Sequence, residues 1–207
     1  IAPMGTFSLD TAHGKHETTT KPAVWAAPHA YASWQLNDSL WLGLGVFSRF
    51  GLGNSYDQNW TGRYNLYSVN LQTISAVPTL AWKINDILSV SAGLEIMNVN
   101  LTTEQKAPIL DHDAEVQASG WGVGGHFGLH ARLNDQWSVG LAYKTQVTVN
   151  AYGDAKFDGP YAGKLQKVTN SDAHSTVQLP DSLALGVAYK PLDNLSFEVG
   201  AVWTRWS

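Results

Sequence analysis

A short turn rich in Asn and Asp recurs along the chain, and each copy lies between two stretches in which apolar and polar residues alternate. The four copies lie near 37–39, 85–87, 134–136 and 192–194. Asn and Asp side chains hydrogen-bond to their own backbone and tolerate left-handed conformations, so each copy predicts a tight reversal between two antiparallel strands. Longer polar stretches separate the copies and are expected to form long loops at the opposite strand ends, near 50–66, 103–116 and 153–174.

The stretches between the turns alternate with a period of two, which is the period of a β-strand. In 137–151 the odd-numbered positions carry mostly apolar side chains, and the even-numbered positions carry small or polar ones. The stretches 117–133 and 176–190 repeat this pattern. The sequence therefore predicts an all-β, antiparallel chain that forms one domain over residues 1–207, with about eight or nine strands.

The expected strands are unusually long, because they run to about fifteen residues where strands of globular proteins average about five or six. A strand of that length crosses the hydrocarbon layer of a membrane at a tilt. Aromatic residues also gather near both strand ends, as in the interfacial belts of membrane barrels; examples are Trp34 and Trp137 near the tight turns and Tyr67 and Trp121 near the loops. Unpaired backbone groups are costly in lipid, so such a sheet must close on itself or be completed by strands outside this chain. We therefore predict a transmembrane β-barrel with apolar faces toward lipid and small, polar faces toward a wet lumen.

Composition excludes several other classes of protein. Charged residues make up 14% of the chain, where an ordinary soluble domain has about 25%. The net charge of −4, without a clustered basic stripe, argues against a nucleic-acid partner. The absence of cysteine removes disulfides, thiolate metal sites and thiol catalysis.

Several segments, in the same order and with similar spacing, resemble one family of membrane proteins. They include GLGVFSRFGL at 43–52, WTGRY at 60–64 and VPTLAWK at 77–83. The others lie at 120–125, 139–145, 153–157, 179–183 and 203–207. Together they resemble the FadL-type family of outer-membrane transporters across most of the chain. The resemblance implies a barrel of about fourteen strands with an N-terminal hatch in its lumen, and this chain would begin after the hatch and stop in mid-barrel.

The resemblance also implies a transport function and a place in the bacterial outer membrane, which the chain would cross several times. The implied transport is passive diffusion of long-chain fatty acids or other hydrophobic small molecules through the barrel lumen and a lateral opening. The expected partners are a hydrophobic ligand, such as a fatty acid, hydrocarbon or detergent, and the lipid and lipopolysaccharide of the membrane. A monomer without cofactor, metal or catalytic residues is expected.

By the same resemblance, apolar side chains near the loop ends of the strands line the ligand path: Trp25, Phe47, Val77, Met97, Val99, Leu101 and Trp206. The stretch 87–102 motivates this choice, because its apolar residues change from even to odd positions between Ile96 and Met97. Either a bulge keeps Met97 and Val99 on the lipid face, or these side chains form an apolar patch inside the lumen. The sequence leaves both alternatives open.

A ligand carboxylate would bind a cation inside the barrel through charge-assisted hydrogen bonds. The candidate lumen cations are Arg49, Lys83, His126, His130, Arg132, Lys144 and Arg205. Alternatively, these cations pair with lumen acids such as Glu95, Asp181 and Glu198. Fatty-acid transporters of the family are expected to carry a basic residue late in the strand that matches 94–102. This chain has Asn98, Asn100 and Thr102 there, which makes neutral hydrocarbons alternative substrates.

Four glycines lie close together in one expected strand: Gly43, Gly45, Gly51 and Gly53. Glycine within a strand marks a bulge or a bend, and the resemblance makes this strand a kinked lateral gate. Alternatively, the glycines only make room in a crowded lumen.

Two other functions are weighed against transport. A structural or adhesive barrel would have a plugged lumen and long loops that contact other cells. A hydrolase or protease would need a catalytic set, for which Asp111 and His112 are the candidates. The sequence lacks the Gly-x-Ser-x-Gly and phosphate-loop motifs, so an enzyme is not expected.

Overall fold

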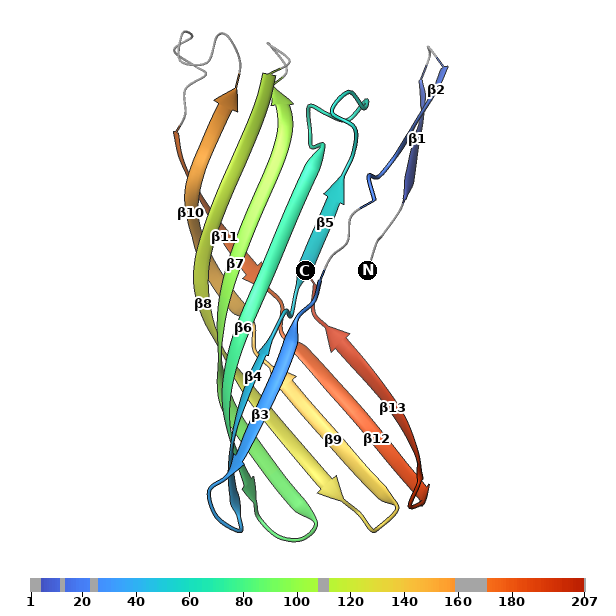
Figure 1. Cartoon of the computed structure of the whole chain (residues 1–207), viewed down its shortest axis with the longest axis vertical. Coiled ribbons are helices and arrows are strands. Elements are labelled where there is room, and N and C mark those ends of the chain that lie inside the picture. The colour runs from blue at the N-terminus through green and yellow to red at the C-terminus, as the bar shows by residue number, and fades with distance from the viewer. Residues whose placement is uncertain (1–4, 12–13, 23–25, 108–111, 159–170, 207) are drawn as a thin grey trace.

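The computed structural model describes residues 5–11, 14–22, 26–107, 112–158 and 171–206, whose regular structure is all β-strand. Figure 1 shows an elongated, twisted sheet with tight turns at one end and loops at the other, and a small hairpin beside the loops. No helix in the described part of the chain is long and apolar enough to cross a membrane. The strands are β1 (Thr6–Thr11), β2 (Gly14–Thr19), β3 (His29–Gln35), β4 (Leu40–Phe47), β5 (Gly51–Ser55), β6 (Ser68–Lys83), β7 (Leu88–Ala107), β8 (His112–Arg132), β9 (Trp137–Lys144), β10 (Val147–Asp158), β11 (Ser171–Leu179), β12 (Ser182–Leu192) and β13 (Leu195–Thr204).

Eleven of these strands form one antiparallel sheet, and β1 and β2 form the separate hairpin. At the tight-turn end the sheet order is β13-β12-β9-β8-β7-β6-β4-β3. At the loop end β5 pairs with β6, and β10 pairs with both β8 and β11. β4 and β5 are thus the two halves of one membrane crossing. The same holds for β9 with β10 and for β11 with β12. With β3, β6, β7, β8 and β13 they make eight crossings in the described chain, and the predicted all-β antiparallel fold is confirmed.

Three tight turns are built by the same hydrogen bonds. The Oδ1 atom of Asn37 accepts the backbone N–H groups of Ser39 at 2.9 Å and Leu40 at 3.0 Å. Asn85 and Asn134 each accept the N–H groups two and three residues later, at 2.9 and 2.8 Å. An Asn at this position satisfies donors that the reversal leaves without a ladder partner, which explains why the residue recurs at the same place in the repeat.

Apolar side chains cover the outer face of the sheet. Trp121 is 67% exposed, and Val123, Leu141 and Leu185 are exposed as well. A contiguous apolar surface of this kind is unusual on a soluble monomer and suits contact with lipid. The apolar faces therefore point outward as predicted, and these residues do not meet in a dry centre.

Exposed aromatic side chains lie near both ends of the apolar zone. Those near the tight turns include Trp34, Trp82, Trp137 and Phe197, and those near the loops include Trp121, Tyr152 and Trp203. The prediction that Tyr67 belongs to the loop-side belt is wrong, because its side chain is 4% exposed and its hydroxyl donates to Asp113 Oδ1 at 2.9 Å. Burial and this hydrogen bond raise the pKa of the Tyr67 hydroxyl above its ordinary value.

The inner face of the sheet encloses an apolar cluster near the middle of β7. The cluster consists of Met97 and Val99 from β7, Val147 and Val149 from β10, and Leu179 from β11, all almost completely buried. Burying one such side chain contributes about 1.5–3 kcal/mol relative to leaving it exposed. The interior is therefore apolar around this cluster, and the small, polar inner faces that the sequence predicts occur toward the tight-turn end.

The stretch 137–151 is not one continuous strand, contrary to the prediction. β9 and β10 are separate strands. From Lys144 to Tyr152 the crossing has one residue more than the stretch of β8 that faces it, which runs from His126 to Ser119. A shift of one residue exchanges the two faces of a strand. Leu141 consequently points outward, whereas Val147 and Val149 are buried inside.

The stretch 176–190 is interrupted as well, at Pro180 and Asp181. Proline has no backbone N–H group to donate to the ladder, so it favours a break at this point. Leu179 is buried inside, whereas Leu185 is exposed outside. Since β9 pairs with β12 and β10 pairs with β11 in one common register, the two interruptions lie side by side.

The strands extend further at the loop end than the sequence predicts. Much of 103–116 and 153–174, expected as loops, belongs to β7, β8, β10 and β11. The stretch 50–66 contains β5 and a turn in which Trp60 stacks on Tyr56, with 4.4 Å between ring centres, and meets Phe7 of β1 at 5.4 Å. These strand ends are polar on both faces and therefore lack the apolar alternation by which strands are recognised in a sequence. For this reason the predicted loops are longer than those of the structure.

Candidate functional site

Three crossings are interrupted within the sheet, and the interruption between β4 and β5 is a bulge. Phe47 lies opposite Ser75 on β6, whereas Gly51 lies opposite Gln72, so β4/β5 carries one extra residue within 48–50. The predicted gate glycines flank this bulge on both sides: Gly43 and Gly45 in β4, and Gly51 and Gly53 in β5. The bulge itself contains Arg49 and no glycine.

Arg49 spans the interior of the sheet from this bulge. Its Nη1 atom donates to Glu95 Oε2 at 2.8 Å and to the carbonyl oxygen of Thr145 at 3.4 Å. Its Nη2 atom donates to the carbonyl oxygen of Pro180 at 2.8 Å and to Ser182 Oγ at 3.2 Å. One side chain therefore contacts β7 and both of the other interruptions, β9/β10 and β11/β12.

Glu95 is the anion of this group and lies completely inside. Its side chain is 0% exposed and that of Arg49 is 6% exposed. Ser75 Oγ donates to Glu95 Oε1 at 2.8 Å, so both carboxylate oxygens are hydrogen-bonded. Arg49 therefore pairs with a lumen acid, as the alternative to ligand binding predicts. Arg205 does so as well, because its Nε atom lies 2.9 Å from Asp181 Oδ1.

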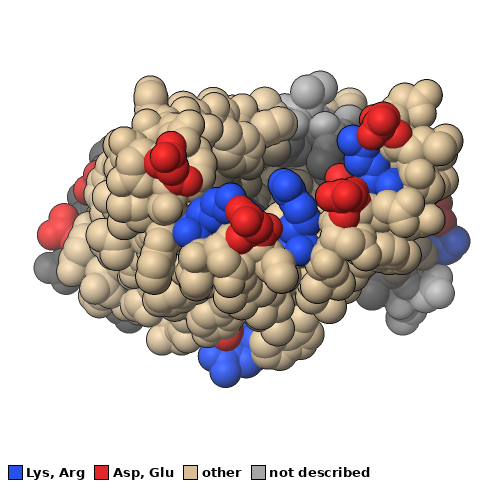
Figure 2. All heavy atoms as spheres, turned by 90° about the horizontal axis from the view of Figure 1, so that it is seen from below, with Lys and Arg blue, Asp and Glu red and all other residues tan. Residues whose placement is uncertain are grey.

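Two further candidate cations lie beside this ion pair. The Lys144 ammonium lies 4.3 Å from the centre of the Phe47 ring, and His126 lies opposite Lys144 in the ladder. A cation over an aromatic face is stabilised by about 0.5–2 kcal/mol, depending on its hydration. Within the described part of the chain Lys144 forms no ion pair. Figure 2, viewed from the tight-turn end, shows charged side chains of both signs around the central hollow.

The remaining candidate cations lie elsewhere. Lys83 pairs with Asp86 in a tight turn at 2.6 Å, and this hydrogen bond lowers the pKa of the Asp86 carboxyl group. His130 and Arg132 lie on β8 closer to the tight-turn end and are exposed. These three cations therefore do not join the group around Arg49.

Three candidate ligand residues lie together on the inner face. Val77, Met97 and Val99 are buried, and Met97 follows Glu95 by two positions on the same face of β7. β7 keeps one register with β8 along its whole length, so no bulge separates Ile96 from Met97. The apolar patch therefore lies inside the sheet.

The other candidate ligand residues are placed differently. Phe47 lies beside the Lys144 ammonium, and Leu101 is partly buried further toward the loops. Trp206 is exposed and meets Phe50 edge to face, with 5.7 Å between ring centres. Trp25 lies outside the described residues.

A cavity of about 1110 Å³ opens at the β4/β5 bulge. Its walls include Phe50, Leu52 and Leu71, and they reach Ile74 and Asn100. Ile74 and Asn100 are exposed on the outer face of the sheet. The cavity thus runs from the interior beside the bulge to the outer surface.

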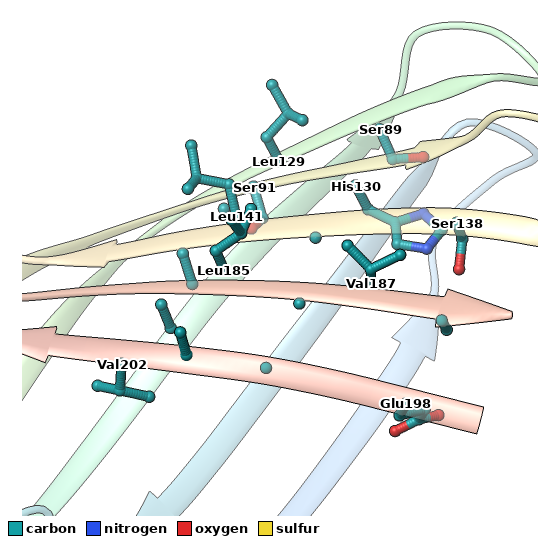
Figure 3. A pocket seen from close by; sticks show the side chains of 18 of the residues that line it. Ser89, Ser91, Leu129, His130, Ser138, Leu141, Leu185, Val187, Glu198 and Val202 are labelled. Carbon is teal, nitrogen blue, oxygen red and sulfur yellow. The ribbon is translucent and has the colours of Figure 1, made fainter.

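A second cavity, of about 760 Å³, lies toward the tight turns. Figure 3 shows His130 of β8 near Ser138 of β9, with Glu198 on β13. Small residues such as Gly140 and Ala142 line the same cavity. The inner-face residues here are smaller and more often polar than those of the apolar cluster.

Asn98, Asn100 and Thr102 lie on the outer face of β7 and do not replace a lumen cation. Asn98 Nδ2 donates to the carbonyl oxygen of Gly120 at 3.2 Å, and Asn100 Nδ2 donates to Asn98 Oδ1 at 2.8 Å. Because these three side chains do not face the interior, they give no information about the charge of a ligand inside the barrel.

Sequence reasoning missed the residues that Arg49 contacts across the interior. Thr145, Pro180 and Ser182 were not candidates, and Glu95 was one of three candidate acids. The available signal was Pro180, because a proline inside an otherwise continuous strand pattern argues for an interruption.

Two curated relatives match most of this chain. A putative outer membrane protein of Neisseria meningitidis serogroup B is 29% identical over 217 residues, which cover 87% of this chain and 47% of the relative. Outer membrane protein P1 of Haemophilus influenzae is 23% identical, with coverage of 87% and 46%. The chain therefore spans about half the length of the curated relatives it matches.

Solved structures resemble the fold. A FadL homologue of Pseudomonas aeruginosa has a TM-score of 0.79 at 20% identity, covering 94% of this chain and 50% of that chain. The toluene transporter TodX of Pseudomonas putida has a TM-score of 0.65 at 18% identity, with coverage of 96% and 58%. The monoaromatic hydrocarbon channel CymD has a TM-score of 0.61 at 14% identity, with coverage of 99% and 58%. The described sheet thus matches part of a 14-stranded barrel.

One protein family matches residues 3–207, and its description is outer membrane protein transport protein (OMPP1/FadL/TodX). The family predicted from the sequence and the location in the bacterial outer membrane are confirmed. The family is one of transport proteins and not of enzymes. This chain belongs to the OMPP1/FadL/TodX family of bacterial outer-membrane transport proteins.

Proposed function

We propose that the protein carries hydrophobic small molecules, such as hydrocarbons or long-chain fatty acids, inward across the outer membrane by passive diffusion. The observation that supports this most is the cavity at the β4/β5 bulge, which runs from the interior to the outer face. A hydrophobic molecule inside the barrel would reach the membrane sideways through this opening. It would not need to cross the small, polar surface at the tight-turn end.

Apolar side chains of the interior would line the path. Contact with such side chains contributes about 25 cal/mol per Å² of apolar surface removed from water. The proposed ligand residues are Phe47, Val77, Met97, Val99 and Leu101, with Trp206 beside the cavity and Trp25 beyond the described residues. Because Met97 and Val99 already pack against β10 and β11, a ligand would compete with those contacts, and weak binding of this kind lets the ligand leave.

The glycines beside the bulge would form the lateral gate. Gly43, Gly45, Gly51 and Gly53 carry no side chain that resists bending of the β4/β5 crossing, and a flexible crossing can widen the cavity. Gly51 and Gly53 line the cavity directly.

The charge balance of the interior favours neutral ligands. Arg49 is already paired with Glu95, so it offers no free charge to a carboxylate. Lys144 would be the cation available to a fatty acid. Two of the similar structures are a toluene transporter and a monoaromatic hydrocarbon channel, which supports neutral aromatic hydrocarbons as a substrate class for this chain as well.

The substitution Gly51→Trp tests the lateral path. A Cβ at Gly51 would meet only the Leu71 carbonyl oxygen, at 3.9 Å, so a larger side chain can be accommodated while its ring fills the cavity. Uptake of toluene and of oleate is measured in cells that lack the native gene and carry each variant. Gly51→Trp should lower uptake severalfold, whereas Leu185→Trp, which changes an exposed residue of β12, should leave it unchanged.

Two outcomes would contradict the proposal in different ways. Normal uptake by folded Gly51→Trp protein would exclude the lateral path. Equal uptake with and without the gene would exclude transport and favour the structural or adhesive barrel.

The membrane itself is the second proposed partner. The exposed apolar face would contact lipid acyl chains, and the polar outer surface near the loops would contact lipopolysaccharide. A monomer is proposed, and chemical cross-linking in outer-membrane vesicles tests it, because a dimer band would contradict it.

A further inference from the structure

The Arg49–Glu95 pair lies entirely inside the protein, although burial of charge is costly. The two side chains are 6% and 0% exposed. Replacement of a buried ion pair by apolar residues of similar volume is often neutral or stabilising. Stability alone therefore does not explain an ion pair beside the buried apolar residues Val77 and Met97.

The contacts of Arg49 connect the three interruptions of the sheet. Arg49 lies in the β4/β5 bulge, and it donates to the carbonyl oxygens of Thr145 and Pro180, one at each of the other two interruptions. An interruption leaves backbone carbonyl groups without ladder partners, so an outside donor is needed there. Arginine presents five N–H donors in a rigid planar fork, and the bond to Glu95 holds that fork in place.

The same group lies at the boundary between the two parts of the interior. On the inner face of β7, Met97 on one side of Glu95 belongs to the apolar cluster, and Ser91 on the other side lines the tight-turn cavity. The Arg49 guanidinium group also lies 4.9 Å from the centre of the Phe50 ring, which borders the lateral cavity. Arg49 and Glu95 thus lie on the inner side of the sheet between the apolar cluster and the tight-turn cavity.

We propose that Arg49 is a latch that ties the three interruptions together and closes the interior to water and ions. Glu95 holds the latch, and hydrophobic ligands leave sideways above it through the cavity at the bulge. Arg49 thus determines selectivity between apolar and polar solutes. This role rests on the proposed function and deepens it, because it assigns the residue that excludes ions from the hydrophobic path.

Ion leak through the full chain in planar lipid bilayers tests the latch. Arg49→Lys keeps a positive charge beside Glu95 but loses the planar fork, and its leak conductance should rise about tenfold as the closed state loses charged hydrogen bonds. A double variant, Arg49→Met with Glu95→Met, leaves no buried unpaired charge and is expected to fold. It should leak as much as Arg49→Lys, because neither variant can hold the contacts with Thr145, Pro180 and Ser182 all at once.

Arg132→Met is the matched control, because Arg132 is an exposed arginine of β8 without a hydrogen bond to Thr145, Pro180 or Ser182 in the described structure. Its leak should equal that of the wild type. Ser182→Ala removes one acceptor of Arg49 and should raise the leak less than Arg49→Lys does. Heat-modifiable gel migration verifies that each variant is folded.

Wild-type leak in folded Arg49→Lys and in the folded double variant would overturn the latch. If neither Arg49 variant folds, Ser182→Ala decides, and wild-type leak in this variant would overturn the latch. If the Arg49 variants leak but the wild-type protein takes up no hydrophobic probe, the latch stands and the proposed transport fails.

Discussion

At the scale of single residues, a missing side chain decides how closely the strands approach each other. Gly122 lies on the inner face of β8, where Val147 and Val149 of β10 pack. A Cβ on Gly122 would lie 2.6 Å from Val147 Cγ1 and 2.8 Å from the Thr148 carbonyl oxygen, closer than real Cβ atoms come to other atoms. The glycine therefore provides the space that the valines fill, and the apolar cluster depends on it.

Gly122→Ala should destabilise the protein by about 1–3 kcal/mol, because the added methyl group overpacks the cluster and pushes on backbone. Gly140→Ala is the control, since a Cβ at Gly140 would meet no atom within 4 Å. Urea unfolding of both variants in lipid vesicles measures the free energy of unfolding. Equal stability of the two variants would show that β10 does not pack closely on β8.

At the scale of strands, the sequence predicts those features that have local causes. The tight turns follow from Asn37, Asn85 and Asn134, and the outward direction of β8 and β12 follows from period-two apolarity. Apart from Pro180 in the β11/β12 crossing, the interruptions have no such signal, because apolar residues line both faces of the sheet near them. The alternation in 137–151 therefore predicts one continuous strand although the crossing is broken, and in 87–102 it does not distinguish a bulge from the inward apolar patch that the regular β7 forms.

The candidate site was predicted only in part, for a related reason. The family resemblance and the alternation make Arg49 and Lys144 two of seven candidate lumen cations, and Glu95 one of their possible partners. The contacts of Arg49 could not be predicted, because the bond to Ser182 joins residues 133 positions apart. A contact of this range depends on how far the sheet curls, and no local pattern in the sequence reports that curvature.

Deletion of Gln146 tests the one-residue shift between β9 and β10. Without this residue the crossing would match β8 residue for residue, so it would alternate continuously with Val147 and Val149 still on the inner face. The deletion variant should therefore keep the heat-modifiable, folded form on gels. Gln146→Ala keeps the length of the chain and should also fold like the wild type. Loss of the folded form in the deletion variant alone would mean that the crossing does not carry one surplus residue at this point.

At the scale of the whole molecule, apolar surface lies outside and an ion pair lies inside, the reverse of a soluble protein. Leu129, Leu141 and Leu185 lie opposite one another on β8, β9 and β12, and all three are exposed. Figure 3 shows these leucines next to one another on adjacent strands. In water this row would promote aggregation, whereas in a bilayer it is the surface that holds the sheet in place.

Leu141→Arg should destabilise the folded protein by about 2–4 kcal/mol in lipid, because an arginine on the lipid face near the bilayer midplane loses its hydration. Ala142→Arg places the same side chain one residue further along β9, where it faces the tight-turn cavity and keeps contact with water. Ala142→Arg should lower the free energy of unfolding clearly less than Leu141→Arg does. Urea unfolding in the same phospholipid vesicles compares the two variants, which differ mainly in the face that carries the charge. If Ala142→Arg were as costly as Leu141→Arg, both faces of β9 would be dry, and the contrast between a lipid-facing outer side and a wet inner side at the tight-turn end would be wrong.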